Sequence, residues 1–246
     1  MKNKIRLSLG LLGLITMLAS PSLAHATAKP LALVWKGPGA CFGCSEAAAS
    51  IAKKAGFKIQ YVKPDLKDFS VFENAKLWVQ PGGVSVTAAD AMGSALINRI
   101  REFVADGGGY VGFCAGAFLS TAQIGTSGVN GLGITPGESE LYAENGPEHQ
   151  MLQVSTPTGV RWFYYAGGPD FTISDSELQA ADGQVIGRYM NGKIAAVEAH
   201  YGKGKVAVSG FHPEANWFWE ILHLKIDPDG NEFAYAIDMV KYATSP

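Results

Sequence analysis

The chain has 246 residues and a formal net charge of −2, with 47% hydrophobic residues, 17% charged residues and 30 glycines. The near-neutral balance and the scattered Lys and Arg exclude the electrostatic footprint of a protein that binds nucleic acid or anionic membranes. The low charge and abundant glycine indicate a compact α/β protein with many tight turns rather than a disordered chain.

Residues 1–28 are predicted to be a secretory signal peptide rather than part of the fold. A basic start precedes a short apolar run over 7–19, and small residues in A-x-A spacing end at Ala26 or Ala28. This is the layout of a cleaved leader, and the apolar run is short for an uncleaved membrane anchor. We therefore expect an exported mature chain over 29–246, located in a periplasm or outside the cell.

The first half of the mature chain predicts strands that alternate with helices. Apolar runs suited to buried strands end at glycine-rich loops, and apolar residues at helical spacing fill the segments between them. The predicted strands cover 30–35, 57–63, 75–80 and 109–114, and the predicted helices cover 45–56, 87–106 and 115–123. Strands that are apolar nearly throughout indicate a parallel sheet covered on both faces. In such a sheet the chemistry gathers at the carboxyl ends of the strands, where glycine-rich loops fall at 37–39, 82–83 and 112–116.

From about Leu132 the pattern changes to short strands that follow one another closely, joined by turns such as Asn191-Gly192. These predicted strands cover 150–155, 160–168, 184–190, 193–201 and 205–211, and a helix over 231–243 closes the chain. We therefore predict a single α/β domain over 29–246. Its expected fold is a flavodoxin-like three-layer sandwich, with a mostly parallel central sheet and an antiparallel hairpin section in the C-terminal half.

Cys114 stands between two glycines where a predicted strand meets a predicted helix. The pattern G-x-C-x-G, from Gly112 to Gly116, is the cysteine version of the nucleophile elbow, a strained turn at which larger side chains would collide with neighbouring backbone. Free N–H groups and the dipole at the amino end of a helix favour a thiolate. Taken alone, the pattern leaves two interpretations open, a nucleophile or a small buried core residue.

The segment FHPE supplies the partners that a cysteine nucleophile needs. Pro213 keeps the chain extended, so the side chains of His212 and Glu214 point to the same side. Glu214 would then orient His212, and His212 would act as the base for Cys114. The alternative for this segment, a turn whose Glu is a solvated surface charge, would prevail if Cys114 were absent.

An oxyanion hole is predicted at the Pro-Gly-Gly loop after the strand over 75–80. The backbone N–H groups of Gly82 and Gly83, with that of Ala115 next to the nucleophile, would bind a developing oxyanion. Such a loop is by itself most often a turn. The joint occurrence of the three motifs at three strand ends favours nucleophilic catalysis.

On these motifs the chain resembles the class I glutamine amidotransferase-like superfamily, and within it the amino-terminal domain of biotin–protein ligases of the eukaryotic type. The resemblance is carried by WKGPGA, GGGYVGFCAGAFL, YYAGGPDF and GKGKVAVSGFHPEANW, spread over residues 31–223. It implies that Cys114 attacks a carboxamide carbonyl, that ammonia or an amine departs, and that water hydrolyses the thioester, with His212 as base and Glu214 as orienting group. It does not imply biotin transfer, because the sequence has no adenylate-binding loop of the ligase type. Glutamine amidotransferases normally pass ammonia to a synthase, but no synthase partner is identifiable from this sequence.

Cys41 and Cys44 form a C-x-x-C pair in a compartment that we expect to be oxidising, which favours a disulfide over thioredoxin-like exchange. Zinc would need further ligands, so no metal site is predicted. If either cysteine reaches Cys114, its redox state would gate the nucleophile. The acidic stretch over 137–149 is expected to be an irregular loop, with Glu138 and Tyr142 as candidate substrate contacts and a solvated loop as the alternative.

We therefore expect an exported cysteine amidohydrolase that acts on a small or peptide-like amide. It is predicted to need no cofactor and to bind neither nucleic acid nor, in its mature form, a membrane. Two alternatives from other classes stay open. One is a non-catalytic binding or structural module that keeps the fold, and the other is a redox protein that uses Cys41 and Cys44, whose activity would survive Cys114→Ser.

Overall fold

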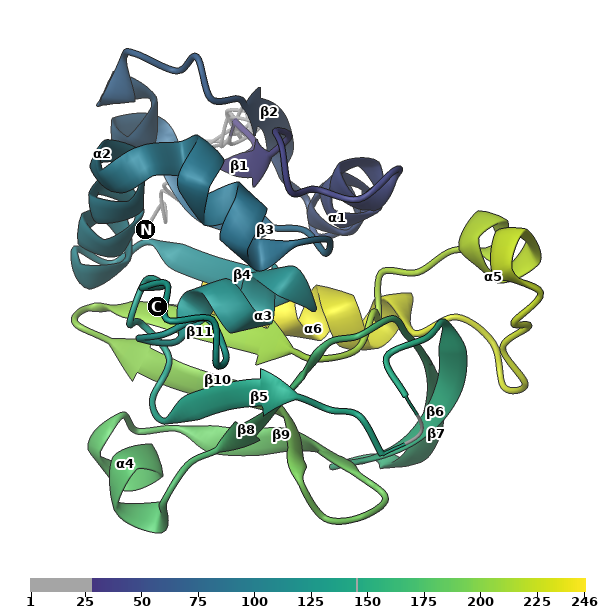
Figure 1. Ribbon diagram of the computed structural model, residues 1–246. Helices are drawn as coiled ribbons and strands as arrows, with labels where there is room; N and C mark the ends of the chain where they lie inside the picture. Colours follow the sequence, from purple (N-terminus) through teal and green to yellow (C-terminus); the bar gives the residue numbers. More distant parts are fainter. Residues whose placement is uncertain (1–27, 145) are drawn as a thin grey trace, which may run out of the picture.

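The computed structural model describes residues 28–144 and 146–246, so the predicted signal peptide lies outside the described residues except for Ala28. Within the described ranges, the strands form one mixed sheet with the order β2-β1-β3-β4-β11-β10-β9-β6-β7, and β8 joins β5 to β10 (Figure 1). The strands are β1 (Leu31–Trp35), β2 (Lys58–Val62), β3 (Ala75–Gln80), β4 (Gly109–Phe113), β5 (Glu138–Leu141), β6 (Gln150–Thr156), β7 (Gly159–Tyr165), β8 (Pro169–Thr172), β9 (Gln184–Tyr189), β10 (Ile194–Tyr201) and β11 (Gly204–Ser209).

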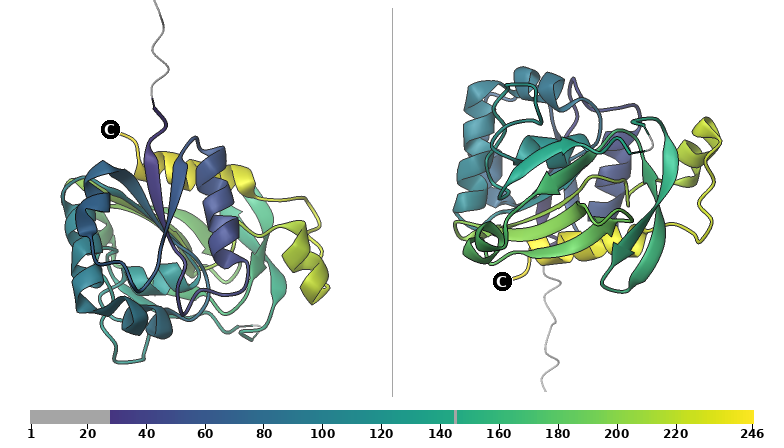
Figure 2. Two further views of the ribbon diagram at one scale, coloured as in Figure 1. Left: turned by 90° about the horizontal axis from the view of Figure 1, so that it is seen from above. Right: turned by 60° about the horizontal axis from the view of Figure 1, so that its bottom comes forward.

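Helices cover both faces of the sheet. The helices are α1 (Cys44–Lys54), α2 (Ser85–Ala105), α3 (Ala115–Ser120), α4 (Asp175–Ala180), α5 (Trp217–His223) and α6 (Phe233–Ala243), with a 3-10 turn η1 (Phe69–Asn74). Helices α1 and α6 pack on one face, and α2 and α3 pack on the other (Figure 2). This arrangement confirms the predicted three-layer α/β fold. No helix in the described ranges is long and apolar enough to cross a membrane.

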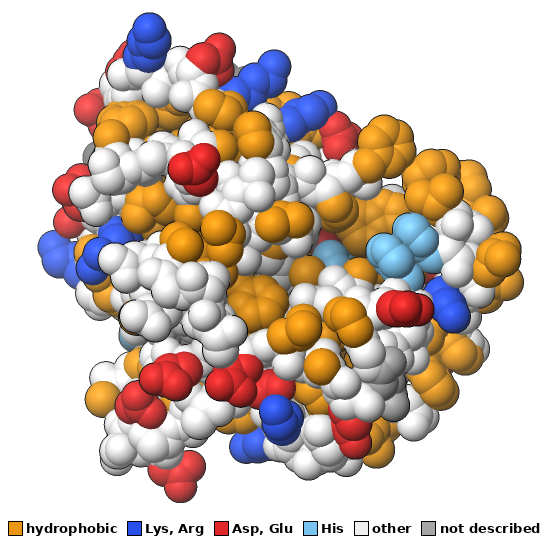
Figure 3. All heavy atoms as spheres, viewed as in Figure 1, with side chains coloured by type: hydrophobic (Ala, Val, Ile, Leu, Met, Phe, Trp, Pro, Cys, Tyr) orange, Lys and Arg blue, Asp and Glu red, His pale blue; other side chains and the backbone are white. Residues whose placement is uncertain are grey.

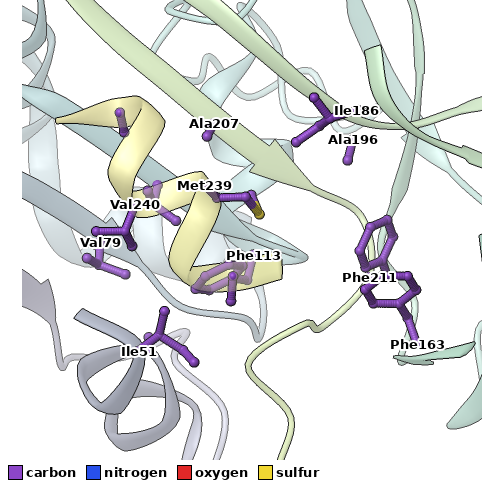
Figure 4. Close-up of a cluster of buried hydrophobic side chains, with 14 of the residues drawn as sticks. Ile51, Val79, Phe113, Phe163, Ile186, Ala196, Ala207, Phe211, Met239 and Val240 are labelled. Carbon is purple, nitrogen blue, oxygen red and sulfur yellow. The ribbon is translucent and has the colours of Figure 1, made fainter. Parts of the chain in front are cut away.

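Two buried clusters, one on each face, hold the layers together. On the face of α1 and α6, Ile51, Met239 and Val240 lie against Val79 and Phe113 of the sheet (Figure 4). Their periodic spacing on the helices produces this apolar stripe, and each fully buried aliphatic or aromatic side chain contributes roughly 1.5–3 kcal/mol relative to an exposed one. The face of α2 and α3 carries a second cluster, formed by Trp78, Leu96, Ile100, Phe103, Tyr110 and others.

The parallel part of the sheet aligns the strand ends that matter for the site. β4 lies between β3 and β11, and all three run parallel. Gln80 pairs with Gly112 and Ser209 pairs with Phe113, so the three strands end at the same level. The segments that follow therefore gather at one edge, as predicted for the Pro-Gly-Gly loop, the elbow and FHPE.

Several short elements depart from the predicted pattern. The irregular loop expected over 137–149 is wrong in part, because β5 forms there and pairs antiparallel with β8. Neither β8, α4 nor α5 was predicted from the sequence, since each spans seven residues or fewer and depends on tertiary contacts more than on local periodicity. The long helix α2 is interrupted at Gly93, whose φ is 64°.

Candidate active site

Cys114 occupies a strained turn between β4 and α3. It has φ 50° and ψ −103°, a positive-φ conformation that is costly for a residue with a Cβ, and it is 2% exposed. The flanking glycines make the turn possible. A Cβ at Gly112 would lie 2.6 Å from the carbonyl oxygen of Gly116, and a Cβ at Gly116 would collide with the carbonyl oxygen of Gln80.

His212 and Glu214 form a buried pair at the end of β11. The Nδ1 atom of His212 lies 2.9 Å from Oε1 of Glu214, and the two side chains are 3% and 0% exposed. The backbone N–H of His212 donates to the carbonyl of Tyr164 at 2.8 Å, which fixes the segment against β7. Among the described residues, Oε2 of Glu214 has no hydrogen-bond partner although it is buried.

Cys114 lies next to this pair. Its Sγ is 3.5 Å from the carbonyl oxygen of Ala166, and its thiol also interacts with His212. Burial acts to lower the pKa of His212, but the charge of Glu214 and the charge of and hydrogen bond with Cys114 raise it to about 10. The imidazole is therefore charged at neutral pH. A charged histidine beside a cysteine is the arrangement that activates a thiol nucleophile.

The Pro-Gly-Gly loop packs directly on His212. A Cβ at Gly82 would collide with Cε1 of the His212 ring, and Gly83 has φ 138° and lies so close to Gly39 that only glycine fits. Within the described part of the chain, the backbone N–H groups of Gly82, Gly83 and Ala115 donate to no other group. Free N–H groups beside a thiol are what an oxyanion hole requires.

Cys41 and Cys44 are joined in a disulfide at the start of α1, whose first residue is Cys44. The loop that carries it is tied to the Pro-Gly-Gly loop, since the N–H of Cys41 donates to the carbonyl of Gly82 at 3.1 Å. Cys44 is fully buried and packs in a small apolar cluster with Tyr164 and Trp219. The disulfide thus anchors the loop that contacts the Pro-Gly-Gly loop, while Cys114 is a free thiol.

An aromatic group surrounds His212. The sequence places Trp217, Phe218 and Trp219 just after FHPE, where they either line the pocket or pack in the core, whereas the contact with Tyr164 was not identified from the sequence. The rings of Trp219 and Tyr164 lie 5.2 and 6.0 Å from the His212 ring. The hydroxyl of Tyr164 is 2.6 Å from Nδ1 of His149, and His149 stacks on His223 at 3.6 Å. The pKa of His149 is lowered mainly by burial, and further by the positive charges of His223 and His212. Histidine side chains gather beside the hollow in this face (Figure 3).

Glu138 and Tyr142 are not brought to the cluster. Glu138 is exposed on β5, whereas Tyr142 is buried, stacks on Tyr189 at 3.7 Å and donates its hydroxyl to Glu144 at 2.6 Å. In the described ranges, no hydrogen bond, ion pair or ring contact joins either residue to Cys114, His212 or Glu214. Their role as substrate contacts stays a prediction.

One group of carboxylates has the spacing of metal ligands. Ligand atoms of Asp227, Asp229 and Glu232 lie within 4.8 Å of one another. Arg161 already binds two of them, at 2.9 Å to Asp229 and 2.7 Å to Glu232. The guanidinium supplies the positive charge that these carboxylates need, and the group lies outside the cluster at the strand ends.

Solved structures share this architecture at low sequence identity. A chain of PurLQS from Thermotoga maritima covers 87% of this chain with a TM-score of 0.58 and 19% identity, and 99% of that chain is matched. A glutamine amidotransferase from Thermotoga maritima covers 88% with a TM-score of 0.54 and 13% identity, and 96% of it is matched. The fold is therefore that of the class I glutamine amidotransferases.

The sequence comparisons indicate which group of proteins with this fold the chain resembles. Residues 32–134 match the family described as the N-terminal part of biotin–protein ligase. The biotin–protein ligase of Schizosaccharomyces pombe is 25% identical over 163 residues, which are 56% of this chain and 25% of the ligase. The chain thus resembles the biotin–protein ligase N-terminal family, as predicted, and the match spans about a quarter of the length of that ligase.

Proposed function

We propose that this protein is an exported, cysteine-dependent amidohydrolase of the glutamine amidotransferase-like type. The proposal is carried by one observation: strained Cys114 lies next to a buried His212–Glu214 pair whose imidazole is charged at neutral pH. The fold shared with a glutamine amidotransferase supports it. Export rests on the leader-like pattern over residues 1–28.

The proposed reaction begins when the Cys114 thiolate attacks the amide carbonyl carbon, forming a C–S bond. The carbonyl oxygen becomes an oxyanion and is stabilised by the N–H groups of Gly82, Gly83 and Ala115. The C–N bond then breaks, and His212 gives its proton to the departing amine, leaving a thioester.

Hydrolysis of the thioester completes the cycle. His212, now neutral, takes a proton from water, and the resulting hydroxide attacks the thioester carbonyl. The C–S bond breaks and releases a carboxylic acid together with the Cys114 thiolate, while His212 is charged again. Glu214 holds the orientation of the ring and stabilises its charged form in both halves of the cycle.

The experiment is covalent labelling of the purified protein with a chloroketone analogue of glutamine near neutral pH. We expect stoichiometric modification of Cys114 by mass spectrometry, with a rate reduced at least about 100-fold in His212→Ala, as is typical when a general base is removed. His200→Ala serves as the matched control, because His200 lies on β10 next to Asp182, outside the cluster.

Two results would contradict the proposal. The first is a Cys114 that reacts no faster in the folded protein than in the denatured chain. The second is an amidase activity that survives Cys114→Ser. A thiol–disulfide exchange activity that survives Cys114→Ser would favour the redox alternative built on Cys41 and Cys44.

A further inference from the structure

A cavity of about 350 Å³ lies between helix α6 and the antiparallel part of the sheet. Its walls come from the hairpin of β6 and β7, from β9 and β10, and from α6 with the two residues before it. We call it the α6 cavity. It shares no residue with the candidate active site, because its lining residue Glu198 pairs with Ala207 inside β11, whereas His212 and Glu214 follow the end of that strand at Ser209.

The floor of the α6 cavity is apolar. Phe163, Ile186 and Met239 line it and are 1%, 8% and 1% exposed, and Figure 4 shows them coming from different elements, β7, β9 and α6. The ring of Tyr235 lies 5.2 Å from that of Phe163, and its hydroxyl donates to the carbonyl of Ile186 at 3.0 Å. A concave, mostly apolar cavity with a few polar groups in its wall is the usual form of a small-molecule site.

One carboxylate in the wall has no basic partner. The charged side chains that line the α6 cavity are Arg161, Glu198, Glu232 and Asp238. Arg161 binds Glu232 at 2.7 Å, and Asp238 binds Lys241 at 2.8 Å. Glu198 is 7% exposed, and it forms no ion pair with any residue in the described ranges. Buried carboxylates are ordinarily paired, so a positive charge is missing at this position.

The side chain of Glu198 has one oxygen open to the cavity. Its Oε2 accepts from Nε2 of Gln184 at 2.6 Å, whereas its Oε1 accepts from no described residue and is not among the fully covered polar atoms. Burial raises the pKa of Glu198; the hydrogen bond from Gln184 opposes this, and the charge of Asp238 adds to it. A cation at Oε1 would stabilise the ionised carboxylate.

We infer that the α6 cavity binds a small primary amine that carries an apolar, ring-bearing body. The ammonium group donates to Oε1 of Glu198, and the body lies against the floor, where a ring can pack on the rings of Phe163 and Tyr235. This inference goes beyond the proposed function and does not depend on it, since it concerns binding at a separate place in the fold.

Other small molecules fit the α6 cavity less well. Arg161 could attract an anion, but it already binds Asp229 at 2.9 Å and Glu232, and the other charged groups of the wall are acidic. A neutral molecule of the same shape would fill the floor but leave Glu198 without a cation. A small amine without an apolar body would leave the floor uncovered, and it would forgo the gain from burying apolar surface.

The test is calorimetric titration of the purified protein at pH 7 with 2-phenylethylamine. The comparison compounds are 2-phenylethanol, which has the same body without the charge, ethylamine, which has the charge without the ring, and phenylacetate, which has the opposite charge. We expect the amine to bind at least roughly 10-fold more tightly than the alcohol, because a charge-assisted hydrogen bond is stronger than a neutral one. It should exceed ethylamine by at least a similar factor, because the ring is buried. Phenylacetate should bind more weakly than the alcohol.

Two variants assign the binding to the α6 cavity. Glu198→Gln keeps the shape of the side chain and removes its charge, so the ratio of amine to alcohol affinity should fall to near one. Ala234→Phe places a ring in the cavity from an exposed position of α6 and should weaken the amine and the alcohol alike. Thermal melting checks that each variant is folded, and Ala234→Phe alone still tests the location if Glu198→Gln does not fold.

Asp170→Asn is the matched control. Asp170 is 2% exposed, lies on β8 outside the cavity and binds Lys193 at 2.7 Å. This variant therefore removes an equally buried carboxylate and should keep the amine-to-alcohol ratio of the parent protein.

Three results would overturn the inference. The first is equal affinity of the parent protein for the amine and the alcohol. The second is tighter binding of phenylacetate than of the amine, which would identify Arg161 as the binding group. The third is amine binding that both Glu198→Gln and Ala234→Phe leave unchanged, since the amine would then bind outside the α6 cavity.

Discussion

His212 is buried, and the charge on its imidazole is favoured by Glu214 and by Cys114. Burial opposes the imidazolium, while Glu214, 2.9 Å from Nδ1, favours it together with Cys114. A variant that removes only the charge of Glu214 therefore distinguishes its effect on the orientation of the His212 ring from its effect on the charge of that ring. Glu214→Gln keeps the shape of the side chain but removes the carboxylate that favours the charged imidazole. In serine enzymes the corresponding change of Asp to Asn leaves the imidazole in the wrong tautomer.

The first prediction follows from the direction of this pKa shift. The folded-state pKa of His212, about 10, lies above its ordinary value of 6.5, so the native state binds the proton more tightly than the unfolded chain. The stabilisation is fully present below about pH 6.5 and is lost as the pH rises toward 10. Melting temperatures measured from pH 6 to 10 should therefore fall in the parent protein and fall less in Glu214→Gln.

The same variant should label at Cys114 roughly 10²- to 10⁴-fold more slowly at pH 7. Glu198 provides the control, because this largely buried carboxylate lies on β10 and binds Gln184 rather than a histidine. Glu198→Gln should leave the labelling rate of Cys114 unchanged. Equal melting curves for the parent and Glu214→Gln above pH 7 would contradict a charged His212 in the native state.

The loop between β1 and α1 is held by its disulfide and is hydrogen-bonded to the Pro-Gly-Gly loop, so the two loops form one structural unit. The N–H of Cys41 donates to the carbonyl of Gly82, and the N–H of Val84 donates to the carbonyl of Gly39 at 2.7 Å. These contacts fix the direction of the free N–H groups of Gly82 and Gly83. The structure thus connects the disulfide to the Pro-Gly-Gly loop, and we expect that redox control of the proposed site would need no bond to Cys114.

We therefore expect reduction of Cys41–Cys44 to slow the labelling of Cys114 by about 10-fold, which is less than the roughly 100- to 1,000-fold loss that is typical when an oxyanion donor is removed altogether. The measurement is mass mapping of Cys114 modification before and after reduction with a phosphine. In Cys41→Ser, Cys44→Ser the rate should already be low and should not respond to the phosphine. A Cys114 that labels equally fast in both redox states would show that the loop keeps its form without the bond.

The helices and strands that the sequence predicts correctly are those with periodic apolar residues or with a glycine at their ends. Buried runs such as LALVW and the spacing in α2 identify the parallel half, and the glycines around Cys114 identify the elbow. Helix α5 escapes prediction because WFWEIL reads as core, whereas only Trp219 of these residues is buried. The contact of His149 with Tyr164 and His223 joins three separate segments. No local pattern encodes such a contact, which depends on the tertiary fold.

In the whole molecule, β11 is the strand at which the parallel part of the sheet meets the antiparallel part. It pairs antiparallel with β10, as a hairpin partner, and parallel with β4, which carries Cys114 at its end. The candidate site therefore draws Cys114 and the Pro-Gly-Gly loop from the first half of the chain, and His212 and Glu214 from the second. Neither half can form the site without the other.

The last prediction is that residues 29–246 unfold as one cooperative unit with the Cys41–Cys44 disulfide intact. The sheet is continuous, and helix α6 packs on β4, β10 and β11. The described residues therefore show no domain boundary, which would be a region with few contacts across it. Calorimetry should give one transition with an enthalpy of about 150 kcal/mol near 60 °C, at roughly 0.7 kcal/mol per residue for about 220 residues. The calorimetric and van't Hoff enthalpies should agree, and Cys114 labelling should be lost over the same interval. Two separate transitions would place a domain boundary between β4 and β11, and would require the site to lie between two domains.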